Sequence, residues 1–144
     1  MQIRTGQVQD SDAIAQLLIE LDYPVVANAV ASKIQQQHED TKAALLVAVV
    51  GSQVLGFISA YFIPQLALAG DFCRISYFCV SPLAQHQGIG KALETAVCSL
   101  AKERGCDRIE VHCHARRTAA HRFYQRQGYT ESPKYLLKRL QTGT

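Results

Sequence analysis

The sequence predicts a mixed α/β (α+β) fold, in which a mostly antiparallel twisted sheet of about six to seven strands is flanked by about four helices. Segments rich in β-branched and aromatic residues alternate with segments whose apolar residues recur at helical spacing. Their order, β-α-α-β-β-β-α-β-α-β, contains no internal repeat and no linker. The chain has 144 residues, 48% of them hydrophobic and 19% charged, enough to build and cover one core. Residues 1–144 are therefore expected to form a single domain.

The chain opens with a short strand and two helices. We expect the strand over Ile3 to Gln7, followed by a helix that begins near Asp12 and is capped by the short polar side chains of Asp10-Ser11-Asp12. The core face of this helix is marked by apolar residues at i, i+3, i+4 and i+7 spacing, namely Ile14, Leu17, Leu18 and Leu21. Pro24 ends the segment, and Ala27 to His38 forms a weaker second helix.

Three strands follow in the middle of the chain. Leu45 to Val50 and Val54 to Ile63 are joined by Gly51-Ser52-Gln53, which is typical of an antiparallel hairpin. Arg74 to Val80 is a third strand, which Ser81-Pro82 ends abruptly.

The C-terminal half predicts a helix, a strand, a second helix and one or two closing strands. The expected ranges are Gly88 to Arg104, Asp107 to His114, Thr118 to Gln127, and Tyr129 onward with Tyr135 to Leu140. Gly105 is placed to end the first of these helices in a left-handed cap, and Gly128 ends the second. Alternation in the strand puts four polar residues on one face: Arg108, Glu110, His112 and His114.

Charge and hydropathy exclude several classes of protein. Fifteen basic and twelve acidic residues leave a net charge of +3, too small for a dedicated nucleic-acid binder but suited to a small anionic ligand. The longest apolar stretches, such as Ala43 to Val50, fall far short of the roughly 20 residues that span a membrane. The N-terminus lacks the pattern of a secretory signal. We therefore expect a cytoplasmic protein that binds neither membrane nor nucleic acid.

The cysteine pattern indicates neither a disulfide framework nor a metal site. Five cysteines are present, an odd number, without a Cys-x-x-Cys pair. The triplet His112-Cys113-His114 resembles a metal cluster, but neighbouring side chains in a strand point to opposite faces and cannot converge on one ion. We expect reduced thiols and no metal.

A glycine loop between a strand and a helix is the main candidate ligand site. The segment from Val80 to Lys91 places Gly88 and Gly90 at the start of a helix, where backbone amides without helical partners and the helix dipole attract anions. Lys91 and His86 add positive charge. A Walker loop needs another glycine five residues before Gly90, and a Rossmann fingerprint needs a third glycine after an early strand, so nucleotide and dinucleotide sites are disfavoured.

The loop matches the pattern Gln/Arg-x-x-Gly-x-Gly/Ala, met by Gln85, Gly88 and Gly90 directly after the strand ending in Val-Ser-Pro. In this it resembles the GNAT superfamily of acyl-coenzyme-A-dependent N-acyltransferases. The resemblance implies that the loop amides hold the pyrophosphate of coenzyme A and that the preceding strand lies along the pantetheine arm. The cofactor-binding residues it implies are Phe78, Val80, Gln85, His86, Gln87, Gly88, Ile89, Gly90, Lys91 and Arg117.

A second segment strengthens this resemblance. Residues Ala120 to Tyr129 are similar to the family's Ala-x-x-Phe-Tyr-x-x-x-Gly-Phe/Tyr motif, and the likeness covers nearly the whole chain. It implies that Tyr124 is the catalytic general acid, which protonates the departing thiolate; otherwise Tyr124 packs beside Phe123. It also implies that a backbone amide around Phe78 to Val80 polarises the thioester carbonyl.

The sequence departs from the family pattern at two positions. Many relatives carry a carboxylate about four residues before the strand's valine, where this chain has Ser76, a poor base for an ammonium group. A water chain, Glu110, His112 or His114 then removes the proton, or the amine has a low pKa, or catalysis is lost. The asparagine often found before the second motif is replaced by Arg117, which with Arg116 either meets phosphate or an anionic acceptor or is a solvated helix start.

The resemblance implies an N-acetyltransferase that moves an acetyl group from acetyl-coenzyme A to a primary amine of a small molecule or protein by direct transfer in a ternary complex. The alternative is a non-catalytic acyl-coenzyme-A sensor or regulatory module. In the family, acceptor specificity comes from the region of Leu21 to Pro24 and from Ile63 to Phe72, and Tyr23 either lines the acceptor pocket or only packs. Relatives often pair through a sheet edge, which allows a homodimer.

Overall fold

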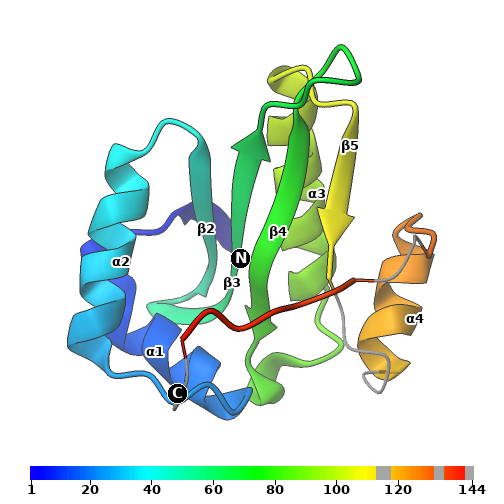
Figure 1. Ribbon diagram of the computed structural model, residues 1–144. Helices are drawn as coiled ribbons and strands as arrows, with labels where there is room; N and C mark the ends of the chain where they lie inside the picture. Colours follow the sequence, from blue (N-terminus) through cyan, green and yellow to red (C-terminus); the bar gives the residue numbers. More distant parts are fainter. Residues whose placement is uncertain (113–117, 132–134, 142–144) are drawn as a thin grey trace. The chain divides into compact units, whose positions relative to one another are not determined.

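The computed structural model describes residues 1–112, 118–131 and 135–141, and the chain divides into two compact units, Met1–Val111 and His112–Thr144. The first unit contains a five-stranded sheet in the order β1-β2-β3-β4-β5 (Figure 1). Neighbouring strands are antiparallel except β4 and β5, which are parallel. The strands are β1 (Gln2–Thr5), β2 (Ala43–Val50), β3 (Gln53–Ile63), β4 (Phe72–Val80) and β5 (Arg108–Val111).

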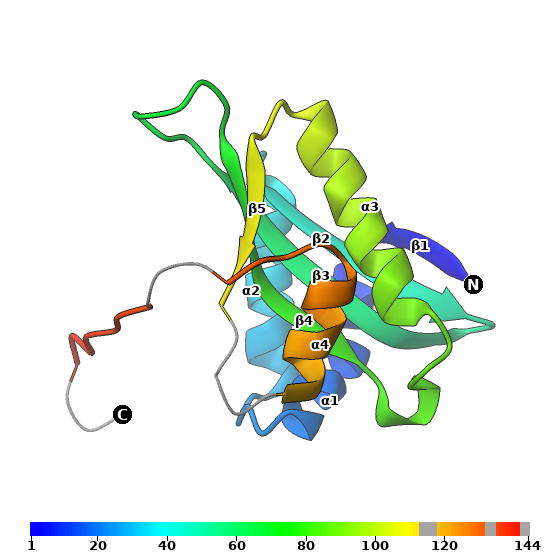
Figure 2. The same ribbon diagram turned by 90° about the vertical axis from the view of Figure 1, so that its right-hand side faces the viewer.

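Helices of the first unit cover the two faces of this sheet. Helices α1 (Ser11–Glu20) and α2 (Ala27–Glu39) pack on one face, and α3 (Ile89–Glu103) packs on the other (Figures 1 and 2). The core under α1 and α2 includes Ile14, Leu17, Val30, Ile34, Val47 and Phe57. The core under α3 includes Ile58, Ala60, Cys73, Ile75, Ile89, Leu93 and Val97. The helical stripes and the β-rich runs of the sequence thus fill two layers of apolar packing, as their periodicities predict. Leu21 is the exception, because it follows the last residue of α1 and is 37% exposed.

Gly56 allows α3 to approach the sheet closely. A Cβ atom at this buried position of β3 would lie 3.0 Å from Ile89 Cγ2, 3.1 Å from the Cys79 carbonyl oxygen and 3.2 Å from Leu93 Cδ1. We expect Gly56→Ala to lower the free energy of unfolding by about 1–3 kcal/mol, because the added methyl overpacks a contact that includes rigid backbone. Urea denaturation monitored by circular dichroism measures this loss, and a variant as stable as the wild type would contradict the close packing.

The first helix begins differently from the prediction. A 3₁₀ turn, η1 (Val8–Asp10), precedes α1, and the Asp10 side chain makes no capping bond to α1. Its carboxylate instead accepts hydrogen bonds from Arg4 Nη1 and Nη2, at 2.8 and 2.9 Å, and from the Gln7 amide at 2.8 Å. A buried carboxylate prefers the guanidinium, which offers two donors and a full charge, so Asp10 ties β1 to the start of α1.

The Arg4–Asp10 pair predicts a loss of stability in acid. The hydrogen bond from Arg4 lowers the pKa of Asp10 below its usual value of 3.8, despite the opposing effect of burial. A carboxylate with a lowered folded-state pKa stabilises the fold above its unfolded-state pKa, and that contribution disappears as the pH falls below about 4 and through the folded-state value. The free energy of unfolding should therefore fall more steeply below pH 4 in the wild type than in Asp10→Asn. Equal slopes would contradict this role, and Asp12→Asn on the exposed side of α1 is the control.

The second unit contains α4 (Thr118–Arg126). The helix ends before Gly128, as predicted; Gly128 has a φ of 95°, and the Tyr129 amide donates to the Tyr124 carbonyl at 3.0 Å. The prediction of one or two closing strands is wrong for the described residues, because 129–131 and 135–141 contain no strand and the sheet has five strands rather than six or seven. Leu136, Leu137 and Leu140 are mostly exposed, so this segment buries no apolar face that would stabilise a strand.

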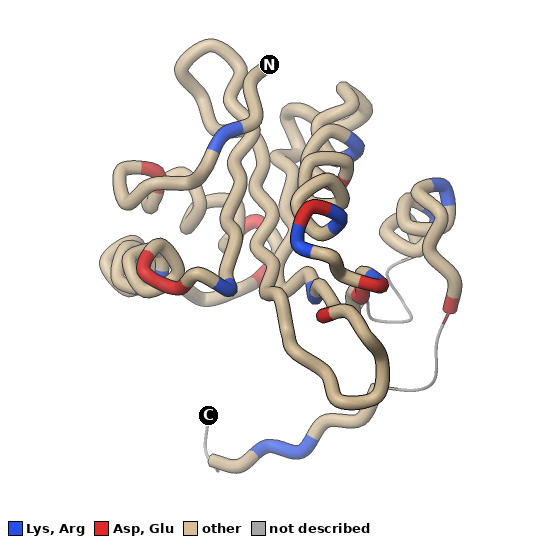
Figure 3. The backbone as a smooth tube through the Cα atoms, turned by 90° about the horizontal axis from the view of Figure 1, so that it is seen from above, with Lys and Arg blue, Asp and Glu red and all other residues tan. Residues whose placement is uncertain are grey.

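Charged residues of the first unit are interspersed rather than sorted by sign (Figure 3). Helix α3, for example, carries Lys91, Glu94, Lys102 and Glu103 in succession along one element. Among the described helices, none is long and apolar enough to cross a membrane.

Candidate active site

The glycine loop joins β4 to α3 through a short 3₁₀ turn, η2 (Pro82–Ala84). The Ser81 hydroxyl accepts a hydrogen bond from the Leu83 amide at 3.2 Å and fixes the start of this turn. Two residues of the loop then adopt left-handed backbone conformations, His86 with a φ of 66° and Gly88 with a φ of 77°. Left-handed residues within such a turn direct successive backbone amides toward one side, which is the geometry of an anion-binding nest.

The first turn of α3 adds further amide donors to the loop. The first helical hydrogen bond runs from the Ala92 amide to the Gly88 carbonyl at 3.0 Å, so the amides of Ile89, Gly90 and Lys91 precede the helical bonding pattern. A Cβ atom at Gly88 would meet nothing within 4 Å, so this side of the loop is open to a ligand. Together with the positive end of the helix dipole, these amides fit a phosphate or pyrophosphate group.

The side chains predicted to bind the cofactor fall into two groups. Gln85, His86, Gln87 and Lys91 are exposed, and Gln85 Nε2 donates to the Val80 carbonyl at 3.4 Å. The apolar residues Phe78, Val80 and Ile89 face the α3 core, and Ile89 is only 2% exposed. Ile89 can therefore meet a ligand only through its backbone, whereas Phe78 and Val80 are half-buried and leave part of their side chains accessible. Arg117 lies outside the described residues.

The second half of β4 forms an edge of the described sheet. Strand β5 pairs with β4 along Phe72–Ile75 and not beyond, whereas the opposite edge of β4 remains paired with β3 as far as Val80. An edge strand presents backbone N–H and C=O groups outward, available to an extended ligand. This edge leads directly into the glycine loop, so strand and loop are continuous in the first unit.

A β-bulge interrupts β4 at Ser76. Ser59 of β3 lies opposite Tyr77, and Ala60 lies opposite Ile75, so Ser76 is the extra residue. Ile75 and Phe78 consequently both face α3, although they are three residues apart. The bulge leaves Ser76 and Tyr77 together on the face of the sheet that α1 and α2 cover elsewhere.

Polar and aromatic groups surround this bulge. The Ser76 hydroxyl lies 3.0 Å from the Ser59 hydroxyl and 3.1 Å from the Ser59 carbonyl oxygen, and Gln37 Nε2 of α2 donates to the Ser59 hydroxyl at 3.1 Å. Tyr77 makes an edge-to-face contact with Tyr23, at 5.3 Å between ring centroids, and both rings are about 40% exposed. The bulge therefore brings two serine hydroxyls and a glutamine amide close to two partly exposed tyrosine rings. A small polar molecule can form hydrogen bonds with these groups.

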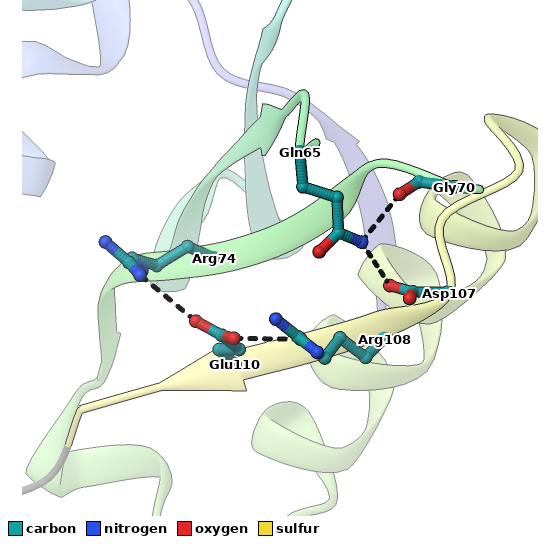
Figure 4. Close-up of polar contacts among 6 residues, drawn as sticks. All are labelled: Gln65, Gly70, Arg74, Asp107, Arg108 and Glu110. Atoms are coloured by element: carbon teal, nitrogen blue, oxygen red, sulfur yellow. Dashed lines mark hydrogen bonds and ion pairs between the residues drawn. The ribbon is translucent and has the colours of Figure 1, made fainter. Parts of the chain in front are cut away.

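Glu110 is a poor candidate for the general base. Arg74 Nη2 lies 3.1 Å from one of its carboxylate oxygens, and Arg108 Nε lies 2.9 Å from the other (Figure 4). Burial raises the pKa of Glu110, but the hydrogen bonds from both arginines outweigh it and hold that pKa below its usual range. A carboxylate stabilised in this way has little tendency to accept a proton. His112, the second candidate for the general base, packs its ring against that of Tyr135, with 4.4 Å between the ring centroids. His114, the third candidate, lies outside the described residues.

Tyr124 lies in α4 of the second unit and is half-buried. Its ring makes edge-to-face contacts with Phe123, at 5.4 Å, and with Tyr129, at 5.3 Å. The motif Ala-x-x-Phe-Tyr-x-x-x-Gly-Tyr therefore forms one helix and its cap, with the Tyr124 ring in contact with the other two aromatic rings.

Three of the four described thiols, those of Cys73, Cys98 and Cys106, are not activated nucleophiles. Burial raises the pKa of Cys73 to about 12 and that of Cys98 to about 12, the latter helped by the hydrogen bond to Glu94, and burial also raises the pKa of Cys106. A thiol with a raised pKa carries little thiolate at neutral pH. Among the described residues, no three His, Cys, Asp or Glu side chains form a group that could hold a metal ion.

Comparison with known proteins decides the family. Residues 12–129 match the Acetyltransferase (GNAT) family. The chain belongs to the GNAT family. An aminoalkylphosphonate N-acetyltransferase of Salmonella typhimurium is 27% identical over 136 residues, which cover 91% of this chain and 86% of that protein. The motifs that the sequence shares with GNAT acyltransferases therefore reflect true membership.

Solved structures share the GNAT fold at lower identity. A transcriptional regulator from Bacillus halodurans C-125 matches with a TM-score of 0.87 and 24% identity, covering 96% of this chain and 99% of that chain. The structure of AAC(6')-Iy in complex with the bisubstrate analog CoA-S-monomethyl-acetylneamine matches with a TM-score of 0.84 and 17% identity, covering 97% of both chains. The mixed sheet with helices on both faces is therefore a GNAT fold, as predicted.

Sequence reasoning missed the polar group at the bulge and the two arginines on Glu110. A signal for the bulge exists in β4, where Ile75 and Phe78 are apolar at a spacing of three, which breaks the alternation of a regular strand. No comparable signal pairs Gln37 with Ser59, because that contact joins residues 22 positions apart on different elements.

Proposed function

We propose that this protein is an N-acetyltransferase that transfers an acetyl group from acetyl-coenzyme A to a primary amine of a small molecule. The observation that carries the proposal is the continuity of the β4 edge with the amide-rich loop before α3, in a chain that belongs to the GNAT family. Two similar proteins support a small acceptor, one named for aminoalkylphosphonates and one bound to an acetylneamine analog of coenzyme A.

Each part of the site has a role in this proposal. The amides of Ile89, Gly90 and Lys91 bind the pyrophosphate, and the β4 backbone around Phe78 to Val80 aligns the thioester and polarises its carbonyl. The amine nitrogen bonds to the carbonyl carbon, and the carbon–sulfur bond breaks. Tyr124 donates its phenolic proton to the departing thiolate.

Proton removal from the amine uses water rather than a carboxylate in this proposal. Glu110 is held ionised by two arginines, and Ser76 stands where many relatives carry an acid. The hydroxyls of Ser76 and Ser59 can bind a water molecule that takes the proton from the amine and passes it to solvent. An acyl-cysteine route through Cys73, Cys98 or Cys106 is disfavoured, because these thiols have raised pKa values, and we propose direct transfer.

Ser76 also favours a second candidate, an acyl-coenzyme-A-binding module that does not turn its ligand over. Turnover separates the two functions. Free thiol released from acetyl-coenzyme A is measured with aminoalkylphosphonates, neamine and a peptide with a free amino terminus as acceptors, and product masses confirm acetylation. The enzyme predicts amine-dependent thiol release with intersecting initial-velocity lines; tight cofactor binding without release for every amine would favour the sensor.

A further inference from the structure

A row of polar side chains crosses strands β3, β4 and β5 of the first unit. Tyr61 of β3 pairs with Arg74 of β4, and Arg74 pairs with Glu110 of β5. The chain neighbours of Arg74, which are Cys73 and Ile75, face the α3 core, so Arg74 points to the opposite face. That face also carries Ser76 and Tyr77 at the bulge. The Arg74 side chain is 40% exposed, so solvent reaches it.

The charges in this row are not balanced. Two guanidinium groups, those of Arg74 and Arg108, share the single carboxylate of Glu110, which leaves one positive charge (Figure 4). Both guanidinium groups also lie over the Phe72 ring. The distance from the guanidinium carbon to the ring centroid is 5.3 Å for Arg74 and 5.5 Å for Arg108. These cation–π contacts with the Phe72 ring stabilise both guanidinium groups on one side, so an anion can approach them from their other sides.

Within the described part of the chain, Arg74 does not use all of its hydrogen-bond donors. Only its Nη2 bonds to Glu110, and its Nε is buried without a hydrogen-bond partner. Buried donors in native proteins are almost always satisfied, and an exception calls for an explanation such as an absent ion or ligand. The accessible part of the Arg74 guanidinium, in net positive surroundings, is suited to a carboxylate or phosphonate, which accepts hydrogen bonds from such a group.

We propose that Arg74 binds an acidic group, a phosphonate or carboxylate, on the amine acceptor and makes the protein select short acidic primary amines. This inference rests on the proposed function. Arg74 precedes Ser76 by two residues on the same face, a separation of about 7 Å along a strand. An acid bound at Arg74 therefore places an amine two or three carbons away near the bulge. Arg108 keeps Glu110 ionised and in place when the acceptor replaces it on Arg74.

The proposal predicts opposite effects of two substitutions. Arg74→Gln removes the charge that binds the acid, so the ratio of kcat/KM for 2-aminoethylphosphonate to that for ethanolamine should fall at least tenfold. Glu110→Gln removes the carboxylate that competes for Arg74, so kcat/KM for the phosphonate should rise. If Arg74 and Glu110 only stabilise the fold, each substitution instead lowers kcat/KM by the same factor for both amines. Lys102→Gln, a charge removal on α3, is the control, and circular dichroism verifies that each variant is folded.

Binding tests the proposal independently of turnover. Isothermal titration of 2-aminoethylphosphonate and of ethanolamine is carried out on the wild type, Arg74→Gln and Arg74→Lys, with and without coenzyme A. We expect the wild type to prefer the phosphonate at least tenfold, Arg74→Gln to lose this preference and Arg74→Lys to keep part of it. Equal affinity of the wild type for both amines, or equal acetylation of both, overturns the role of Arg74 and leaves the acetyltransferase standing. Failure of coenzyme A to bind refutes the acetyltransferase, whereas phosphonate binding that depends on Arg74 is unaffected by that outcome.

Discussion

Tyr124→Phe is expected to lower the rate of acetyl transfer at least tenfold and to leave acetyl-coenzyme A binding unchanged. The substitution removes only the phenolic hydroxyl, and a phenylalanine ring retains the edge-to-face contacts with Phe123 and Tyr129. A positioned general acid contributes about 10²–10⁴-fold to a rate, so its loss is readily measured. Steady-state kinetics give kcat and KM, and calorimetry gives the affinity for acetyl-coenzyme A.

Tyr129→Phe provides the matched control for Tyr124. It makes the same chemical change on a ring in contact with Tyr124, at a position where the family motif accepts either aromatic residue. We expect this variant to retain the wild-type rate. If Tyr124→Phe also retains it, Tyr124 is not the acid and serves only to pack the helix and its cap.

Gly88→Val is expected to weaken acetyl-coenzyme A binding at least tenfold. Gly88 has a φ of 77° and a ψ of 9°, a left-handed conformation that costs an L-residue about 1–2 kcal/mol and a β-branched residue more. A Cβ atom here would meet nothing within 4 Å, so the strain comes from the backbone conformation and not from a clash at Cβ. Valine favours a different backbone conformation and covers the amides that start α3. Calorimetric titration with acetyl-coenzyme A measures the loss.

Two controls separate loop geometry from general strain. Gly51→Val introduces the same kind of strain in the β2–β3 hairpin, where φ is 62° and no atom lies within 4 Å of a Cβ. It should lower stability without changing the affinity for acetyl-coenzyme A. Gly88→Asn should bind more tightly than Gly88→Val, because asparagine tolerates the left-handed region. Wild-type affinity in Gly88→Val would show that the loop does not hold the pyrophosphate.

Local sequence signals account for most of the first unit. The stripe of Ile14 and Leu17 and the hairpin turn at Gly51 depend on neighbouring residues only, so their periodicity and turn chemistry identify them. The glycine loop is local as well, because the left-handed residue and the helix start lie next to each other in the chain. The GNAT motifs then indicate what kind of ligand such a loop holds.

Long-range contacts limited the remaining predictions. Asp10 resembles a helix cap in sequence, but Arg4 reaches it from β1 and takes its carboxylate. Glu110 resembles an exposed strand carboxylate, yet Arg74 of a parallel neighbour joins Arg108 in holding it ionised. Tyr135 to Leu140 has the composition of a strand, but forming one also requires a partner and a face to bury, which composition does not reveal.

The most direct test of the acetyltransferase proposal is the thermal unfolding of the purified protein with acetyl-coenzyme A, coenzyme A or ATP added separately. A ligand that binds only the folded state raises the midpoint of unfolding, and the rise grows with the logarithm of the ligand concentration once this exceeds Kd. The amide-rich loop and the β4 edge predict a rise with acetyl-coenzyme A and with coenzyme A, and none with ATP, because the loop lacks a Walker pattern. No rise with either coenzyme A species at saturating concentration would contradict the proposed cofactor and with it the proposed function.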